Sequence, residues 1–133
     1  MARYVLDAVT LLHVVTHNVA IDVSHQIVAP NAIRSQALTM LLDAVNAGEL
    51  SEADALALHE RLTELKMRLL GDRVSRRTAW KIAREHGWTS TLDAEYLAVC
   101  RLQADALVTV DTGFAARAAG IVALAPLSAL TAA

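Results

Sequence analysis

Residues 105–111 read DALVTVD, and this short stretch decides the class of fold that the chain adopts. Its centre is an unbroken apolar run with branched side chains, which is typical of a buried β-strand. Asp111 ends the run, and residues 113–119 then predict a short helix that ends at Gly120. A buried strand followed at once by a helix is the unit from which α/β domains are built.

The rest of the chain alternates between strands and helices in the same way. Further predicted strands lie at residues 3–6, 26–30 and 121–125. Predicted helices lie at residues 9–16, 31–47, 51–65, 73–86 and 89–104. Residues 65–71, LKMRLLG, suit either a short strand or the tail of the preceding helix. We therefore predict a single α/β domain over residues 1–133, with a central, mostly parallel sheet of about five strands between helices.

The composition is that of a well-packed globular domain. Hydrophobic residues make up 55% of the 133 residues and charged residues 20%, so the chain does not have the composition of a disordered one. Aromatic residues are 4%, which argues against base-stacking platforms such as the RRM or the OB-fold. The net charge of -2 gives no overall attraction to nucleic acid or to membranes. The single cysteine, Cys100, excludes an internal disulfide and a C-x-x-C zinc site.

No segment has the layout of a membrane span or a signal peptide. The longest uncharged stretch, residues 8–21, contains His13, His17 and Asn18 and is too short and too polar to cross a bilayer. The start of the chain includes Asp7 and lacks the charged and apolar regions of a signal peptide. We therefore expect a soluble, cytoplasmic protein with no membrane partner.

Three aspartates occupy positions where an acidic side chain is informative. Asp7 and Asp111 each come directly after a predicted strand, and in parallel sheets ligands bind beyond the carboxyl ends of the strands. Asp93 begins a helix within reach of that edge, on a stripe with Tyr96 and Cys100 that predicts burial. A buried carboxylate is costly unless it is paired, hydrogen-bonded or bound to a metal. Asp93 therefore predicts either a buried structural bond or a shared metal site.

A metal site would remove the repulsion between these three aspartates. Bare carboxylates at one edge would raise one another's pKa values, whereas a divalent cation would neutralise them. Oxygen donors favour Mg²⁺ or Mn²⁺, which contact phosphate groups in many enzyme sites. The pattern therefore predicts a metal-dependent phosphodiester site. The alternative is that Asp7 and Asp111 are ordinary cap or turn residues, as a lone aspartate after a strand usually is.

Four segments of the chain, taken in order, resemble the PIN domain. They are RYVLDAVTLL (3–12), APNAIRSQALTMLL (29–42), TLDAEYLAV (91–99) and ALVTVDTGFAARAAG (106–120), and together they span nearly the whole chain. The segments are most similar to those of VapC toxins from bacterial toxin–antitoxin pairs. The resemblance implies a parallel sheet between helices and a Mg²⁺- or Mn²⁺-dependent ribonuclease that uses four acids. It also implies a homodimer and a small cognate antitoxin as partners.

The resemblance assigns roles to four residues. Asp7, Asp93 and Asp111 correspond to the first, third and fourth acids of the family and would be its metal ligands and catalytic residues. Gln36 stands at the second position, where the family usually has Glu, and would also be catalytic. Gln keeps a carbonyl oxygen but has no charge, so Gln36 would ligate a metal weakly or orient a water molecule.

Basic and acidic residues gather in different parts of the chain. Residues 66–84 hold seven of the twelve Lys and Arg residues, whereas residues 43–64 hold six acids and one arginine. The basic residues expected to contact RNA phosphates are Arg73, Arg76, Arg77 and Lys81. The alternative is that both segments are ordinary solvated helix faces. An acidic antitoxin would suit the same basic surface.

Other polar and aromatic positions carry weaker signals. Thr10 and Thr112 place hydroxyl groups near the predicted site, and Glu95 is expected to point away from it. Trp80 fits a core position of its helix, whereas Trp88 lies in a loop and is expected to be partly exposed.

Three hypotheses about function follow. The leading one is a VapC-like, metal-dependent endoribonuclease that acts as the toxin of a toxin–antitoxin pair. The second is a PIN-like binding module with weak or lost catalysis, and Gln36 is the residue that favours it. The third is an unrelated α/β domain with unconnected acids, which the ordered match of four segments disfavours.

Overall fold

Four parallel strands form the central sheet in the computed structural model, which describes residues 1–133. The strands are β1 (Arg3–Leu6), β2 (Gln26–Pro30), β3 (Arg68–Leu70) and β4 (Ala106–Val108). Their order across the sheet is β3-β2-β1-β4, so β1 lies at the centre with β2 and β4 as its neighbours. Because all strands run the same way, each connection must return across the sheet, and helices make these returns.

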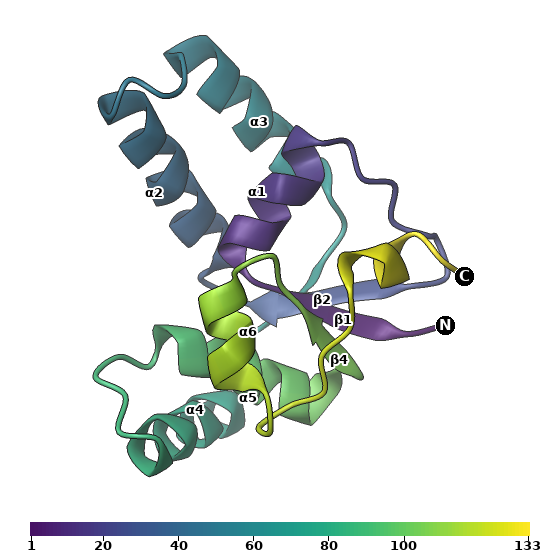
Figure 1. Ribbon diagram of the computed structural model, residues 1–133, viewed down its shortest axis with the longest axis vertical. Coiled ribbons are helices and arrows are strands. Elements are labelled where there is room, and N and C mark those ends of the chain that lie inside the picture. The colour runs from purple at the N-terminus through teal and green to yellow at the C-terminus, as the bar shows by residue number, and fades with distance from the viewer.

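Helices cover both faces of this sheet. They are α1 (Ala8–Thr16), α2 (Ile33–Asn46), α3 (Glu52–Glu64), α4 (Arg73–Glu85), α5 (Leu92–Gln103) and α6 (Thr112–Ala118). Figure 1 shows α1, α2 and α3 on one side of the sheet and α4 and α5 on the other. The α/β fold class with a parallel sheet between helices is therefore confirmed. No helix is both long enough and apolar enough to span a bilayer.

Apolar side chains on the two faces of the sheet belong to two separate buried clusters. Leu6, Ile27 and Val108, from three neighbouring strands, meet Val14 of α1 and Leu130 near the end of the chain. Residues next to them along each strand point to the opposite face, as the pleat requires, and join a core of 23 buried residues that includes much of α5. Burial on both faces explains why the strands are continuous apolar runs in the sequence.

The predicted strand at residues 121–125 is wrong, so the sheet has four strands and not five. The segment pairs with β4 through one isolated bridge, in which Leu107 exchanges hydrogen bonds with Ala123 and Ala125 at 2.9 Å each. Pro126 follows directly, and Leu127–Leu130 then form a 3-10 helix, so the segment does not continue alongside β4. Residues 65–71, by contrast, resolve as a strand, because α3 ends before Leu65 and β3 pairs with β2.

The carboxyl ends of the four strands share one edge of the sheet. Asp7 follows β1 there, and Thr109 follows the neighbouring β4. The ends of β2 and β3 approach closely, since a Cβ atom at Gly71 would lie 2.1 Å from the Asn31 side chain. Asp72 accepts the Ser75 N–H at 2.8 Å and so starts α4 at this same edge.

Candidate functional site at the carboxyl edge of the sheet

Asp7 is a buried carboxylate at the end of the central strand. The residue is 7% exposed. Thr10 donates its hydroxyl to Oδ1, and Thr109 donates its hydroxyl to Oδ2 at 3.0 Å. Burial raises the pKa of Asp7 above its ordinary value, and the hydrogen bonds from the two threonines oppose that rise only in part. No cationic side chain pairs with Asp7, so its charge is held by dipoles alone.

The same two threonines join Asp7 to the loop that follows β4. The Thr10 hydroxyl accepts the Val110 N–H at 3.0 Å, and the Thr109 hydroxyl accepts the Asp111 N–H at 3.1 Å. Each hydroxyl therefore donates to the carboxylate and accepts from the neighbouring backbone. This network fixes the first and fourth predicted acids at adjacent strand ends. The sequence predicts Thr10 as a nearby hydroxyl, whereas nothing in it singles out Thr109 except its place two residues before Asp111.

Asp111 caps the helix that follows it. Its Oδ1 accepts the Phe114 N–H at 3.0 Å, so Asp111 is the N-cap of α6. The side chain is exposed, and its second oxygen receives no hydrogen bond. The alternative of a cap residue is thus confirmed for Asp111, and its other carboxylate oxygen has no hydrogen-bond partner.

The prediction that Asp93 is buried is wrong. Its side chain is 46% exposed and pairs with Arg117 at 2.6 Å between Oδ2 and Nη2. Tyr96 and Cys100 on the same stripe are buried. The stripe is therefore real, but Asp93 lies in the first turn of α5, where the helix leaves the core and Arg117 of α6 can reach the carboxylate.

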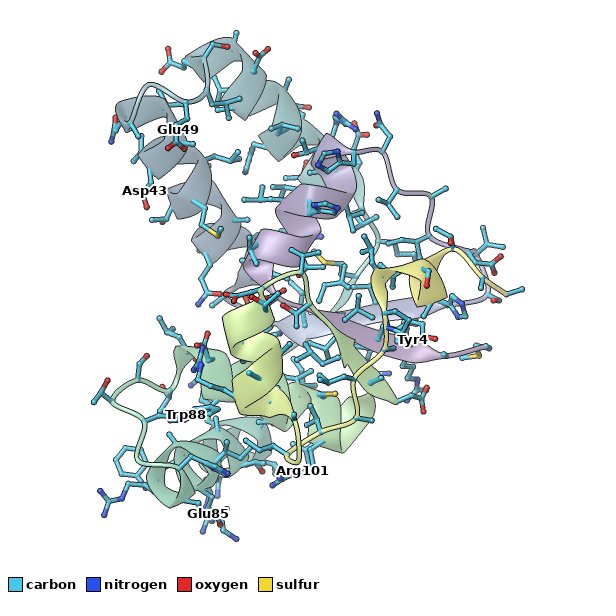
Figure 2. The ribbon with its side chains drawn as sticks, viewed as in Figure 1. Tyr4, Asp43, Glu49, Glu85, Trp88 and Arg101 are labelled. Carbon is cyan, nitrogen blue, oxygen red and sulfur yellow. The ribbon has the colours of Figure 1, made fainter.

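Arg117 is held in place by aromatic rings as well as by Asp93. Its guanidinium carbon lies 5.2 Å from the ring centre of Trp88 and 5.4 Å from that of Phe114. Figure 2 shows Trp88 beside α6, and Trp88 is partly exposed as expected. Arg117 was missed from the sequence, because nothing local links it to an aspartate 24 residues earlier.

Gln36 points inward and contacts Tyr96 of α5, as its position on α2 predicts for an inward side chain. It is half-buried, and its Oε1 accepts the hydroxyl of Tyr96. Burial raises the pKa of Tyr96, and the negative charges of Asp7 and then Asp93 raise it further. Tyr96 therefore binds the amide of Gln36 and is close enough to both carboxylates to feel their charge. The sequence placed Tyr96 on the core stripe and did not indicate this link.

The residues at this edge have the donor atoms that a hard cation prefers, but they are not arranged as a metal site in this structure. Carboxylate oxygens of Asp7 and Asp111 and the amide oxygen of Gln36 are donors of the kind that Mg²⁺ and Mn²⁺ prefer. The structure nevertheless contains no group of three acidic, histidine or cysteine side chains close enough to hold a metal ion. Asp93 in particular would have to exchange Arg117 for the cation.

The predicted RNA-contacting residues all lie on α4. Arg73, Arg76, Arg77 and Lys81 are exposed there, outside the carboxylate network. Trp80, on the same helix, is 63% exposed, so the prediction of a core position is wrong. The buried face of α4 is made instead by small and medium side chains, namely Ser75, Ala79, Ile82 and Ala83.

Comparison with known proteins shows the fold and no more. No protein-family model matches the chain, and no curated protein matches it either. A solved structure, the crystal structure of PAE2754 from Pyrobaculum aerophilum, is similar with a TM-score of 0.74 and 21% sequence identity. The match covers 97% of this chain and 93% of that chain. At this identity the likeness establishes that the two chains share their overall architecture.

Proposed function

We propose that this chain is a metal-dependent endoribonuclease of the PIN type, the toxin of a VapBC-like pair. Asp7 is the observation that carries the proposal. A buried carboxylate without a cationic partner lowers stability, so its place at the ligand-binding edge of a parallel sheet favours a role in binding. The four segments that resemble the PIN domain supply the assignment to a family.

Asp7, Asp93 and Asp111 are the residues that would hold Mg²⁺ or Mn²⁺. Such a cation, when bound, supplies an acidified water molecule and positive charge for the phosphate. Thr10 and Thr109 fix the carboxylate of Asp7 through their hydroxyls, so the donor is oriented before a ligand arrives.

Tyr96 contacts Gln36, and Arg117 contacts Asp93. The Tyr96 hydroxyl donates to Gln36 and leaves the amide NH₂ group of Gln36 available to a water molecule or a phosphate oxygen. Arg117 neutralises Asp93 in the free protein and becomes available to an anion when that carboxylate binds a cation.

A binding module with weak or lost catalysis is the second candidate. Two observations favour it. Gln36 contributes no charge where the family usually has Glu, and the charge of Asp93 is already balanced by Arg117. Both features reduce the attraction that the site offers to a divalent cation.

The proposal includes a homodimer and a small antitoxin as partners. Its support is the apolar surface on the hairpin of α2 and α3, where Leu38, Leu42 and Leu56 are exposed around a small hollow. Light scattering should show a dimer, and a lone monomer at high concentration would contradict this part of the proposal.

Cleavage of a structured RNA with and without Mn²⁺ tests the central claim. Wild type should cleave only with the metal, and Asp7→Asn should lower the rate at least about 100-fold, as loss of a charged group at a metal site does. Calorimetry with Mn²⁺ alone is the accompanying measurement. Metal binding and RNA binding without cleavage would favour the second candidate, and absence of metal binding would remove the nuclease proposal.

Gln36→Glu separates the two candidates more sharply. A fourth carboxylate should tighten Mn²⁺ and raise cleavage, because a hard cation depends on the supply of carboxylates. Gln26→Glu is the matched control, since Gln26 opens β2 at the opposite edge of the sheet. If Gln36→Glu behaves like this control in both assays, Gln36 is not the second position of the site.

A further inference from the structure

Trp80 is the largest apolar side chain that the fold leaves in solvent. Its residue is 63% exposed, whereas Trp88, the other tryptophan, packs against the core. Single exposed apolar residues are common, so exposure alone means little. The surroundings of Trp80 are what distinguish it.

Cationic side chains surround Trp80 on the exposed face of α4. Arg76 and Arg77 precede it by one turn, and Arg84 follows it by one turn, so all three share its face. Arg73 lies one turn further toward the start of the helix. None of these arginines forms an ion pair, because the pair between Arg117 and Asp93 is the only one in the structure. Unpaired like charges on one face repel one another and attract a polyanion.

This face leads to the proposed site. Helix α4 begins directly after β3, at the edge where Asp7 and Asp111 lie, and it packs along α5. A hollow of about 410 Å³ lies between the two helices. It is lined by Arg76, Ala79, Trp80, Thr91 and Glu95. Its lining from α5 comes from the first turn of that helix, which also carries Asp93.

We propose that Trp80 stacks on a base of single-stranded RNA while the arginines beside it neutralise the adjoining phosphates. The inference deepens the proposed nuclease function and rests on it. An exposed indole offers a flat surface to any base, and flanking cations hold the backbone, which is the usual combination in single-strand binding. The strand would run along α4 toward the edge where Asp7, Asp93 and Asp111 lie.

Two other occupants fit this face less well. A two-fold contact between copies of the chain would place the arginines of α4 against the same arginines of the partner copy, which is unfavourable. An RNA duplex keeps its bases stacked inside, so it would meet the cations but not use Trp80. Single-stranded RNA uses both features.

Fluorescence of Trp80 tests the inference directly. In a Trp88→Phe variant, Trp80 is the sole tryptophan, and a single-stranded oligoadenylate of about ten nucleotides should quench it. The titration is done with EDTA present and in an Asp7→Asn background, so that neither metal nor cleavage affects it. A matched RNA duplex should bind more weakly and quench little.

Substitutions then separate stacking from charge. Trp80→Ala should weaken binding of the oligoadenylate by about 10-fold or more, and Trp80→Phe should restore most of it. Arg77→Gln should weaken binding and lower its dependence on salt, because fewer counterions are released. Lys66→Gln is the control, because Lys66 lies before β3 at the opposite edge of the sheet and should have no effect.

Each outcome bears on the inference separately from the nuclease proposal. Binding without quenching, or equal affinity for Trp80→Ala and wild type, would overturn the stacking role. A Trp80→Ala variant that loses dimerisation but keeps RNA affinity would also overturn it and assign the face to a contact between copies. Failure of the nuclease proposal has a different signature, namely wild type that quenches and binds the oligoadenylate but never cleaves RNA.

Discussion

Asp7 and Asp93 are two carboxylates of one predicted site in opposite surroundings. Asp7 is 7% exposed, has no cationic partner and is held by two threonine hydroxyls. The Asp93 side chain is 46% exposed and is paired with Arg117. The first charge is costly to the fold, and the second is already balanced in the free protein.

These opposite surroundings determine how much free energy each carboxylate would gain on binding a cation. A cation that reaches Asp7 relieves an existing destabilisation, so binding should raise stability strongly. A cation that reaches Asp93 must first displace a guanidinium and gains correspondingly less. Substitutions at these residues and their partners should therefore affect the metal-free and the metal-bound protein differently.

Thr10→Val should give the largest loss of stability. Thr10 is fully buried, donates to Asp7 and accepts the Val110 N–H, so valine would remove one of the two hydroxyls that hold the buried carboxylate and would leave the partly buried Val110 N–H without its partner. We expect a loss of about 2 kcal/mol in the free energy of unfolding, measured with urea. Thr112→Val is the control, because Thr112 is exposed and should change little. Equal effects at the two positions would mean that the threonine network does not support Asp7.

Asp7→Asn should stabilise the metal-free protein while it removes function. Asparagine fills the same space without a buried charge, so the free energy of unfolding near pH 7 should rise by about 1 kcal/mol. Asp43→Asn, on the exposed side of α2, is the control and should have no such effect. An Asp7→Asn protein that melts below wild type in EDTA would show that Asp7 contributes net stability to the fold.

The pH dependence of this gain follows from the raised pKa of Asp7. The folded protein favours the protonated carboxyl, so wild type loses stability as pH rises from the ordinary aspartate pKa through the higher pKa in the folded state. The advantage of Asp7→Asn should therefore be absent in acid, below both values, and complete above the folded pKa. Urea unfolding of both proteins between acid and neutral pH measures it, and a gain that is constant with pH would contradict the cause.

The sequence was sufficient to predict the edge where these residues meet. Alternating strands and helices imply parallel strands, and parallel strands bring their carboxyl ends together, so Asp7 and Asp111 were placed correctly at adjacent strand ends. The inward direction of Gln36 also followed from its helical stripe. In these cases a local pattern and a general rule of topology determine the result.

The failures share a different physical origin. The pair of Asp93 and Arg117 depends on how α5 and α6 approach each other, which no local pattern encodes. Trp80 was assigned to the core because its position is periodic, but the buried face of α4 consists of Ser75, Ala79, Ile82 and Ala83, and Trp80 lies outside it. Residues 121–125 have the composition of a strand, but they meet β4 at a single bridge before the chain enters the 3-10 helix Leu127–Leu130.

Arg117→Met should increase the affinity of the protein for Mn²⁺. Methionine keeps an apolar contact with the rings of Trp88 and Phe114 but frees Asp93 from its cation. Mn²⁺ affinity measured by calorimetry should increase by up to about fivefold, the range expected for an exposed ion pair. Arg101→Met, near the other end of α5, is the control. Unchanged affinity in Arg117→Met would mean that Asp93 is not a ligand.

Asp93→Asn should have the smallest effect on the metal-free protein. Its ion pair with Arg117 is exposed on both sides, and such pairs gain little because water screens the charges and two flexible side chains must be ordered. Arg117 also keeps its position over Trp88 when the carboxylate is gone, so the local packing survives. The free energy of unfolding in EDTA should therefore change by no more than about 0.5 kcal/mol.

The same variant should nevertheless lose part of the stabilisation that Mn²⁺ gives to wild type, since one proposed ligand has no charge. Melting temperatures of Asp93→Asn and Asp7→Asn, each with and without Mn²⁺, complete the comparison. Asp7→Asn should start higher than wild type and gain least from the metal, whereas Asp93→Asn should start level with wild type and gain an intermediate amount. If the two variants start at the same temperature in EDTA, burial does not separate the two carboxylates energetically, and the contrast between them fails.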